Sequence, residues 1–357
     1  MAIPESDGRP IISYFDLTNS SLKVMKCGNA SCSAGNVATT LDNTGALGRH
    51  TSVAVGTTGA PDLFPVISYF GGVSTTSTAA GTLKVAKCLD ANCTTAPTLT
   101  VVDSSVASVG LFTSIAIPPA GAPNRFPVIS YYDGTNGNLK VAKCINAACS
   151  GATIITVLDG TLLGIDVGRF TSIAVPGDFL PVISYLNVTG ANLKVAKCSA
   201  ADCSGVPTLT TVDGSGTVAQ RNSISISTDG FPVIAYQNQT SSQLRVFKCT
   251  NATCSTGSFS IVDSALDPQF ISITVPADGK PVISYQDVTA AALKAAKCGD
   301  AACSAGNTVS TVDSPGAGGN GTAIAVPVDG LPFIAYADPT LGRLKTLKCS
   351  NAGCVNP

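Results

Sequence analysis

The hydrophobic positions of this chain fall in short runs that turn residues separate, and no stretch shows a sustained helical apolar period. One representative segment has runs at residues 113–117, 127–132, 139–144 and 153–159. These runs are rich in Val, Ile, Thr and Tyr, and Gly, Pro, Asn and Asp bound them, which is typical of strands joined by tight turns. The runs are apolar rather than cleanly alternating, so we expect sheets that are buried on both faces.

This group of four strands recurs seven times. Each copy has a proline before an apolar strand with a tyrosine (PVISY), then LKVAKC or a close variant, and a second cysteine five residues later. Successive prolines of the repeat are 55, 62, 54, 51, 49 and 51 residues apart. The pattern predicts an all-β chain: one domain over residues 1–357 that forms a seven-bladed β-propeller with four-stranded antiparallel blades. A linear β-solenoid is the main alternative, but its coils are usually shorter.

The first and last copies are incomplete. Residues 2–4 match the end of the first strand of later copies, and no copy of the TVD strand follows Cys354. We therefore expect a clipped first strand in the first blade and a last blade of three strands. The open edge of that blade is a candidate surface for self-association. The strand TSIAV alternates small and large residues, which suits the crowded axis, so we place it innermost.

All the cysteines belong to the repeat, and we expect each pair to close a disulfide loop after the third strand. Zinc is the alternative, but it needs four ligands, each blade offers two, and the chain has one histidine. We therefore predict an oxidising compartment and neither a metal nor a cofactor. The pairs are Cys27 and Cys32, Cys88 and Cys93, Cys144 and Cys149, Cys198 and Cys203, Cys249 and Cys254, Cys298 and Cys303, and Cys349 and Cys354.

Composition narrows the classes of function. Only 12% of the residues are charged and the net charge is -1, which argues against a nucleic-acid binder and against a polybasic membrane-surface protein. No apolar run is long enough for a membrane span, so we expect no membrane insertion. Residues 1–10 lack the basic start and apolar core of an export signal. The extracellular, cell-surface or periplasmic location that the cysteines predict thus requires a signal that this chain does not show.

The two basic positions of LKVAK hold 14 of the 21 cationic residues. They could form a belt for an anionic polymer. We favour structural ion pairs instead, because an aspartate ends the fourth strand in six copies. These aspartates are Asp42, Asp103, Asp159, Asp213, Asp263 and Asp313.

The repeat varies most just before the innermost strand. Those side chains would lie at one mouth of the central channel, beside the turns between the second and third strands. Arginines next to aromatic rings suit a sugar or a carboxylate ligand. The alternative is that the phenylalanines plug the channel and the arginines are solvated. The candidate ligand-binding residues are Arg49, His50, Phe112, Arg169, Phe170, Arg221, Phe270, Asp133 and Asp287.

We assign no catalytic residue, because His50 is alone, no GxSxG motif occurs, and the aspartates occupy repeated structural positions. The three arginines are similar to the arginine cluster of sialidases, but the Asp-box motif and tryptophan are absent. Residues 133–138 look like a calcium loop, yet they lack the later glutamate and lead into a strand, so we interpret them as a hairpin turn.

The repeat PVISYxD…LKVAKCxxxxC…TVD…TSIAV resembles one found in uncharacterised bacterial secreted or cell-surface proteins, over essentially the whole chain. The resemblance implies a propeller and an exported protein. The organisation is also similar to that of seven-bladed lectin propellers, which bind glycans between blades. We therefore expect a non-enzymatic recognition or scaffold protein that binds a glycan or a protein. An extracellular glycoside hydrolase or lyase and a self-assembling surface protein are the alternatives.

Overall fold

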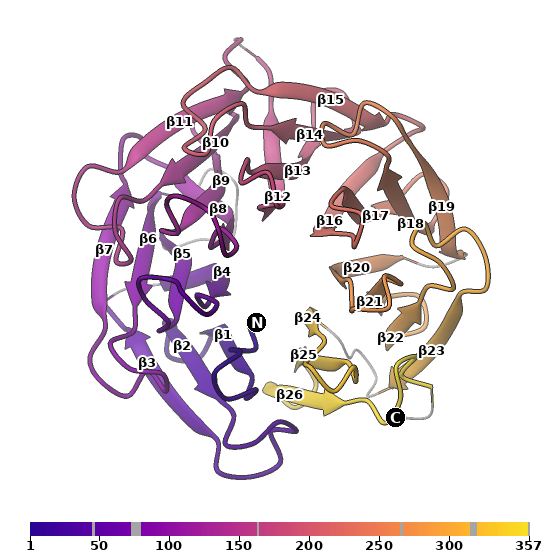
Figure 1. The fold of residues 1–357 in the computed structure, drawn as a ribbon, viewed down its shortest axis with the longest axis horizontal. Helices are drawn as coiled ribbons and strands as arrows, with labels where there is room; N and C mark the ends of the chain where they lie inside the picture. The colour runs from indigo at the N-terminus through magenta and orange to yellow at the C-terminus, as the bar shows by residue number, and fades with distance from the viewer. Residues whose placement is uncertain (45–46, 73–79, 163, 265–266, 315–319, 356–357) are drawn as a thin grey trace. The chain divides into compact units, whose positions relative to one another are not determined.

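The computed structural model describes residues 1–44, 47–72, 80–162, 164–264, 267–314 and 320–355. Within these residues there are 26 strands and no helix, and hence no helix that could cross a membrane. The strands form seven antiparallel sheets, which are the blades of a seven-bladed β-propeller (Figure 1). This confirms the fold class that the repeat predicts.

In complete blades the strands lie in chain order across the sheet, and we name them a to d. Blades 1 to 3 comprise β1 (Ile11–Asp16), β2 (Ser21–Lys26) and β3 (Val37–Asp42); β4 (Leu47–Ala54), β5 (Val66–Gly72), β6 (Gly81–Lys87) and β7 (Thr98–Asp103); and β8 (Val109–Ala116), β9 (Val128–Asp133), β10 (Asn138–Lys143) and β11 (Ile154–Asp159).

Blades 4 and 5 comprise β12 (Val167–Ala174), β13 (Val182–Asn187), β14 (Asn192–Lys197) and β15 (Thr208–Asp213); and β16 (Val218–Ile226), β17 (Pro232–Asn238), β18 (Gln243–Cys249) and β19 (Gly257–Ser264). Blades 6 and 7 comprise β20 (Pro268–Thr274), β21 (Val282–Asp287), β22 (Ala292–Lys297) and β23 (Thr308–Asp313); and β24 (Asn320–Ala325), β25 (Phe333–Asp338) and β26 (Arg343–Lys348).

The first and last blades have three strands each in the described residues, as the sequence predicts. In blade 1, strand a is reduced to one antiparallel bridge between Ala2 and Ile11. In blade 7, β26 is the last strand of its sheet, so its outer edge is unpaired within the described part of that sheet.

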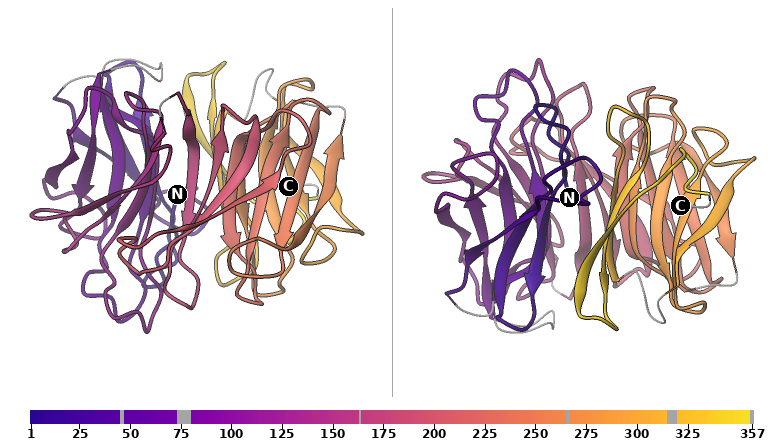
Figure 2. Two further views of the ribbon diagram at one scale, coloured as in Figure 1. Left: turned by 90° about the horizontal axis from the view of Figure 1, so that it is seen from above. Right: turned by 90° about the horizontal axis from the view of Figure 1, so that it is seen from below.

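The chain divides into two compact units, and the division passes through blade 4. Unit 1 is Met1–Ile183, Asn187–Thr189 and Ala196–Leu209; unit 2 is Ser184–Leu186, Gly190–Val195 and Thr210–Pro357. Within each, the strands run side by side between loops at both of their ends (Figure 2).

Strands a of successive blades contact one another through small side chains. In unit 1 the backbone N–H of Ile173 donates to the Ser114 hydroxyl over 3.3 Å. In unit 2 the N–H of Ile273 donates to Ser223 over the same distance. A larger side chain at either serine would separate the strands, which is consistent with the innermost position that we predicted for strand a.

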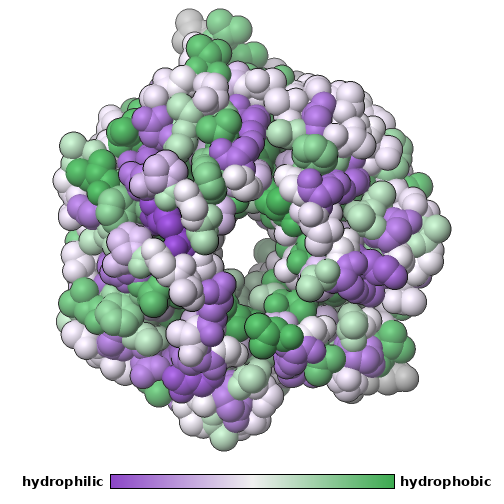
Figure 3. Space-filling view, viewed as in Figure 1, coloured by the Kyte–Doolittle hydropathy of each residue, from purple (hydrophilic) through white to green (hydrophobic). Residues whose placement is uncertain are grey.

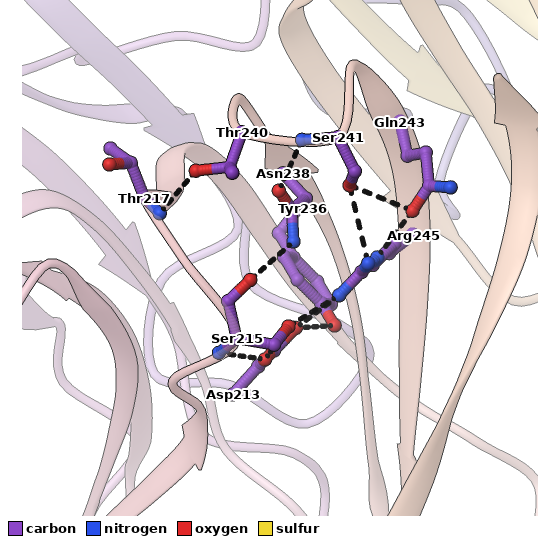
Figure 4. Close-up of polar contacts among 9 residues, drawn as sticks. All are labelled: Asp213, Ser215, Thr217, Tyr236, Asn238, Thr240, Ser241, Gln243 and Arg245. Carbon is purple, nitrogen blue, oxygen red and sulfur yellow. Dashed lines mark hydrogen bonds and ion pairs between the residues drawn. The ribbon is translucent and has the colours of Figure 1, made fainter. Parts of the chain in front are cut away.

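The aspartate that ends strand d of one blade binds two side chains of the next blade, and we call this arrangement the interblade latch. Asp103 accepts a hydrogen bond from the Tyr131 hydroxyl (2.8 Å) and one from the Lys140 ammonium (2.7 Å). Asp213 binds Tyr236 (2.7 Å) and Arg245 (3.0 Å) in the same way (Figure 4). The latch recurs in the sets Asp42, Tyr69 and Lys84; Asp263, Tyr285 and Lys294; and Asp313, Tyr336 and Lys345.

At Asp103 the latch is a buried electrostatic contact, whereas the latch at Asp313 is partly exposed. The side chains of Asp103 and Lys140 are 1% and 7% exposed. Burial and the charge of Asp103 raise the pKa of Tyr131 well above its ordinary value, so the phenol stays protonated and donates. Burial alone would raise the pKa of Asp103, but hydrogen bonds from Lys140 and Ser105 bring it below its ordinary value. The predicted pairs between LKVAK cations and strand-d aspartates are therefore confirmed at these five latches.

The second basic residue of the motif binds the loop between strands a and b of its own blade. The Lys87 ammonium donates to Asp62 (2.7 Å) and to the carbonyl oxygen of Phe64 (2.7 Å). The equivalent pairs are Lys26 and Asp7, Lys197 and Asp178, Lys248 and Asp229, Lys297 and Asp278, and Lys348 and Asp329.

Blade 3 departs from this pattern. Asn124 occupies the aspartate position, and Lys143 donates to the carbonyl oxygen of Phe126 instead (2.5 Å). Burial lowers the pKa of Lys143 to about 8, and the more distant charge of Asp202 opposes this shift. Blade 3 thus has a buried ammonium without the carboxylate that other blades supply.

Seven disulfide bonds use all the cysteines and confirm the predicted pairing. Each second cysteine has a positive φ, between 49° and 56°, and closes a short turn. The turn also contacts the preceding blade: Thr100 on β7 donates to the carbonyl oxygen of Ala148 (2.9 Å), inside the Cys144–Cys149 loop. The bonds indicate an oxidising compartment.

We expect Tyr131→Phe to lower the free energy of unfolding by about 1–3 kcal/mol, because a hydrogen bond to a buried carboxylate is lost. Urea denaturation of Tyr131→Phe, Asp103→Asn and the double variant measures the coupling between the two groups. Coupling of about 1 kcal/mol or more is expected, whereas additive effects would show that the latch is not an energetic unit.

We expect Asn124→Asp to stabilise the protein at pH 7 by about 1 kcal/mol, because it gives the Lys143 ammonium a partner. In the wild type the folded pKa of about 8 is below the unfolded value of about 10.5, so this group raises stability as pH rises between the two values. The advantage of the variant should therefore shrink from pH 7 to pH 10. An advantage that is independent of pH would contradict this explanation; Asn146→Asp, in the exposed disulfide loop, is the control.

Candidate functional site

The residues that we predicted to precede strand a lie within it, which corrects the expected boundary. In β8, Ser114 pairs with Ser130, and the pairing resumes beyond an irregularity at Leu111 and Val109. Of the two skipped residues, Phe112 and Thr113, Phe112 has a φ of 52°. This left-handed conformation is uncommon for a phenylalanine, so the bulge could not be predicted from the residue types. His50, Phe170 and Phe270 have the same conformation at the equivalent position.

The aromatic candidates of unit 1 pack on one another. The ring of Phe112 lies 4.5 Å from that of His50 and 4.4 Å from that of Phe170, between centroids. Tyr132, which is buried, lies 6.1 Å from Phe112. The half-buried rings of His50, Phe112 and Phe170 therefore pack in a contiguous row.

Each of the three candidate arginines stacks on a different aromatic ring. The guanidinium carbon of Arg49 lies 4.5 Å from the centroid of the Phe15 ring, and that of Arg221 lies 4.9 Å from Phe270. Arg169 lies 5.4 Å from the Tyr132 ring. Within unit 1, Arg49 and Arg169 therefore pack on different aromatic rings.

The two candidate aspartates, Asp133 and Asp287, serve the turns between strands b and c. Asp133 is 2% exposed and accepts hydrogen bonds from the backbone N–H groups of Thr135 and Asn136 (both 3.1 Å). Asp287 is 3% exposed, accepts from the N–H of Ala290 and pairs with Lys294 at 2.8 Å. Their carboxylates stabilise these turns and are not presented to solvent.

One of the candidates, Arg169, lines an open cleft of about 600 Å³ in unit 1. One wall is the b–c turn of blade 3, residues 134–138, and the other is formed by residues 160–162 and 164–166 of the connection from β11 to β12. The described residues that line it are Tyr132, Gly134, Thr135, Asn136, Gly137, Asn138, Gly160, Thr161, Leu162, Gly164, Ile165, Asp166 and Arg169.

A hydrogen-bonded triad forms the charged part of this cleft. Arg169 donates from Nη2 to Asp166 Oδ2 (2.6 Å) and from Nε to Oδ1 (3.3 Å), and the Tyr132 hydroxyl donates to Oδ1 (2.9 Å). The side chains of Arg169 and Asp166 are each 29% exposed, whereas Tyr132 is buried. Two of the five guanidinium N–H donors are used in these bonds, so others can serve a ligand.

Tyr132 and Arg169 each keep one charge state over the physiological pH range. Burial and the charge of Asp166 raise the pKa of Tyr132 to about 12, so its hydroxyl remains a donor. Burial opposes the charge of Arg169, but the hydrogen bonds with Asp166 and Tyr132 raise its pKa above the ordinary value. A ligand therefore meets a cation and an anion that already neutralise each other.

A repeated backbone frame positions Asp166. Its N–H donates to the Thr189 hydroxyl (2.8 Å), and its carbonyl oxygen accepts from the N–H of Val188 (2.9 Å). Ser108 makes the same two kinds of contact with its own b–c turn, as does Thr217, whose bond to Thr240 is drawn in Figure 4. The two backbone hydrogen bonds are the same in these blades, whereas the residue that makes them is Asp, Ser or Thr. Variable side chains on a fixed backbone are typical of a binding loop on a rigid scaffold.

Sequence reasoning missed Asp166, Asn136 and Asn138, but a signal existed. The connection from strand d to strand a has seven residues here, 160–166, against five at 104–108 and four at 214–217. Extra length in a repeat connection commonly marks the binding face. Asp166 is the last residue of this connection, immediately before strand a. Our prediction instead named residue pairs that lie inside strand a, such as Arg169 and Phe170.

Close contacts between the two walls fix the width of the cleft. The N–H of Val167 donates to the carbonyl oxygen of Gly137 (2.9 Å). With its amide oriented to donate, Asn138 bonds the carbonyl oxygen of Gly160 (2.6 Å). A Cβ at Gly137, where φ is 75°, would lie 2.5 Å from the carbonyl oxygen of Ile165. The turn thus needs glycine to reach the opposite wall.

One carboxylate lies among the mainly polar and small residues that line the cleft in the described part of the chain. Asp166 is the only acid among the described lining residues, whereas glycosidases generally use a pair of carboxylates. In the described part of the chain, no group of three or more His, Cys, Asp or Glu is placed to hold a metal ion. On the face in Figure 3, hydrophilic and hydrophobic residues are interspersed, so the coloured residues there show no broad apolar patch.

Comparisons with known proteins show the fold and no family. No protein-family model and no curated protein matches the chain. A protein of unknown function from Dyadobacter fermentans aligns with 84% of this chain and 93% of its own, at 9% identity and a TM-score of 0.58. A mutant of AofleA from Arthrobotrys oligospora covers 83% and 81%, at 11% identity and a TM-score of 0.53. The GH93 α-L-arabinofuranosidase of Fusarium graminearum with arabinobiose covers 84% and 91%, at 10% identity and a TM-score of 0.52.

We expect Gly137→Ala to destabilise the protein by more than 1 kcal/mol, from the positive φ and from the contact with Ile165. Gly164→Ala is the matched control, since its φ is 80° but nothing lies within 4 Å of the added Cβ. Comparing the thermal unfolding of both variants separates the destabilisation caused by the positive φ from that caused by the contact with Ile165. Equal losses for the two variants would show that the walls are not in close contact.

Proposed function

We propose that this protein is a non-enzymatic recognition module that binds a hydroxylated ligand, of the size of one or two sugar residues, in the cleft beside Arg169. The observation that carries the proposal is the triad of Arg169, Asp166 and Tyr132 at the wall of a cleft of about 600 Å³. Ligand sites generally have volumes of this order and a few fixed polar groups.

The lining groups match the hydrogen bonds of a sugar. Each sugar hydroxyl donates one hydrogen bond and accepts others, so it pairs well with a neighbouring donor and acceptor. Arg169 and Asp166 supply such a pair within 2.6 Å of each other. The exposed Thr135, Asn136 and Thr161 add hydroxyl and amide groups around them. Leu162, 72% exposed, gives the apolar surface on which a sugar ring can rest.

Two further facts support an extracytoplasmic glycan as the ligand. The disulfides indicate an oxidising compartment, which is where a secreted or surface protein meets glycans. The arabinofuranosidase with arabinobiose shows that a protein of this fold can hold a sugar, although its likeness to this chain is one of fold alone. The single acid in the cleft is the reason to prefer binding over a hydrolase or lyase.

Self-association is a second candidate function, and the edge of β26 is the observation that favours it. In the described residues β26 ends the sheet of blade 7, and an unpaired strand edge can pair with another chain. Sedimentation velocity over a range of concentrations tests it, and a single monomeric species throughout would contradict it.

Binding of glycans to an array is expected for the wild type and is expected to fall at least tenfold for Arg169→Ala, because this variant loses the donors at the cleft. Arg49→Ala is the matched control: Arg49 also stacks on an aromatic ring of unit 1 but does not line the cleft. It should retain binding. Equal losses for both variants, or the absence of any binding by folded wild-type protein, would refute the proposal.

A further inference from the structure

The two charged residues of the cleft are already paired with each other. Arg169 and Asp166 are the only charged residues among the described lining residues, and two hydrogen bonds join them. We propose that Asp166 determines the charge class of the ligand: the cleft accepts a neutral hydroxylated ligand and rejects one that carries a carboxylate. This inference rests on the proposed function and narrows it.

Because Asp166 neutralises Arg169, the cleft offers no net positive charge to a ligand that carries a carboxylate. A carboxylate that approached Arg169 would lie beside both oxygens of Asp166, and these already accept hydrogen bonds from Arg169 and Tyr132. Like charges at such separations repel, and this repulsion is a common means of excluding wrong ligands. A neutral hydroxyl can instead accept from the guanidinium and donate to the carboxylate at the same time.

Blade 6 has the same carboxylate with two amide donors. Asp267 occupies the frame position of Asp166, and its oxygens accept hydrogen bonds from Gln237 (2.5 Å) and Gln269 (3.0 Å). These amides stand at the positions of Tyr132 and Arg169. The aspartate therefore organises donors whether or not they carry charge. At Asp166 one of the two hydrogen-bond donors is itself a cation, and that pairing is the feature that the proposal invokes.

Asp166→Asn isolates this effect. An asparagine keeps the shape and can still accept the Tyr132 hydrogen bond, but it leaves the guanidinium without its counter-charge. A free guanidinium binds a carboxylate through two parallel hydrogen bonds. The substitution should therefore convert a neutral site into an acid-binding one.

The experiment measures binding of methyl β-glucoside and of methyl β-glucuronoside to the intact disulfide-bonded protein by NMR titration. The two ligands differ only at C6, which is a hydroxymethyl group in the glucoside and a carboxylate in the glucuronoside. We expect the wild type to prefer the glucoside at least tenfold and Asp166→Asn to prefer the glucuronoside at least tenfold. The new binding should weaken with added salt. Asp62→Asn is the control: its carboxylate pairs with Lys87 and does not line the cleft, so the substitution should leave the preference unchanged.

The outcomes separate this inference from the proposed function. Equal binding of the two glycosides by the wild type would overturn the charge selectivity and leave the binding function intact. Binding of neither glycoside by the wild type would count against the proposed function, and Asp166→Asn would still decide the inference: no gain of glucuronoside binding would overturn it. If Asp166→Asn does not fold, Arg169→Gln serves instead. It should bind neither glycoside, and glucuronoside binding by it would contradict the proposal.

Discussion

The interblade latch is the interaction on which the rest of this structure depends. A carboxylate that is almost fully removed from water is stable only when strong partners satisfy it, and Asp103 has such partners in Tyr131 and Lys140 of the next blade. Because both partners belong to the following repeat, each blade needs its neighbour, and the two must keep one relative position. The hydroxyl contacts between strands a and the bond from Thr100 to a disulfide loop act at the same boundaries.

This constraint explains where a function can reside. The tyrosine, the two basic residues, the strand-d aspartate and both cysteines are occupied by structural bonds at most blade boundaries, so a cationic belt along the repeat is not open to a ligand. The positions that remain lie on the turn and connection that each blade adds to the frame. There, Thr189 fixes the backbone of Asp166 while the side chain is free to differ from Ser108 and Thr217. Side chains on this rigid frame can therefore vary to form a binding site without breaking the hydrogen bonds of the interblade latch.

The sequence predicts the parts of the molecule that repeat. The spacing that recurs in each copy predicts the number of strands, the seven disulfides and the pairing of lysines with aspartates. Each copy must meet the same structural requirement, so seven copies give seven observations of it. The bulge at Phe112 could not be predicted, since its left-handed backbone is one that phenylalanine rarely adopts. Asp133 looked available because burial by its own turn is invisible in the sequence. Arg169 was predicted but Asp166 was not, because the cleft depends on a connection that differs from its counterparts in length.

The central claim is that ligand recognition occurs at the cleft that Arg169 lines, between residues 134–138 and the described residues 160–162 and 164–166. The most direct test is a crystal structure of the wild-type protein soaked with a neutral glycoside. The account predicts the sugar within hydrogen-bonding distance of Arg169 and Asp166, with Asn136 or Thr161 at its edge. A sugar bound at Arg49 and Phe15, or at Arg221 and Phe270, with the cleft left empty, would contradict it.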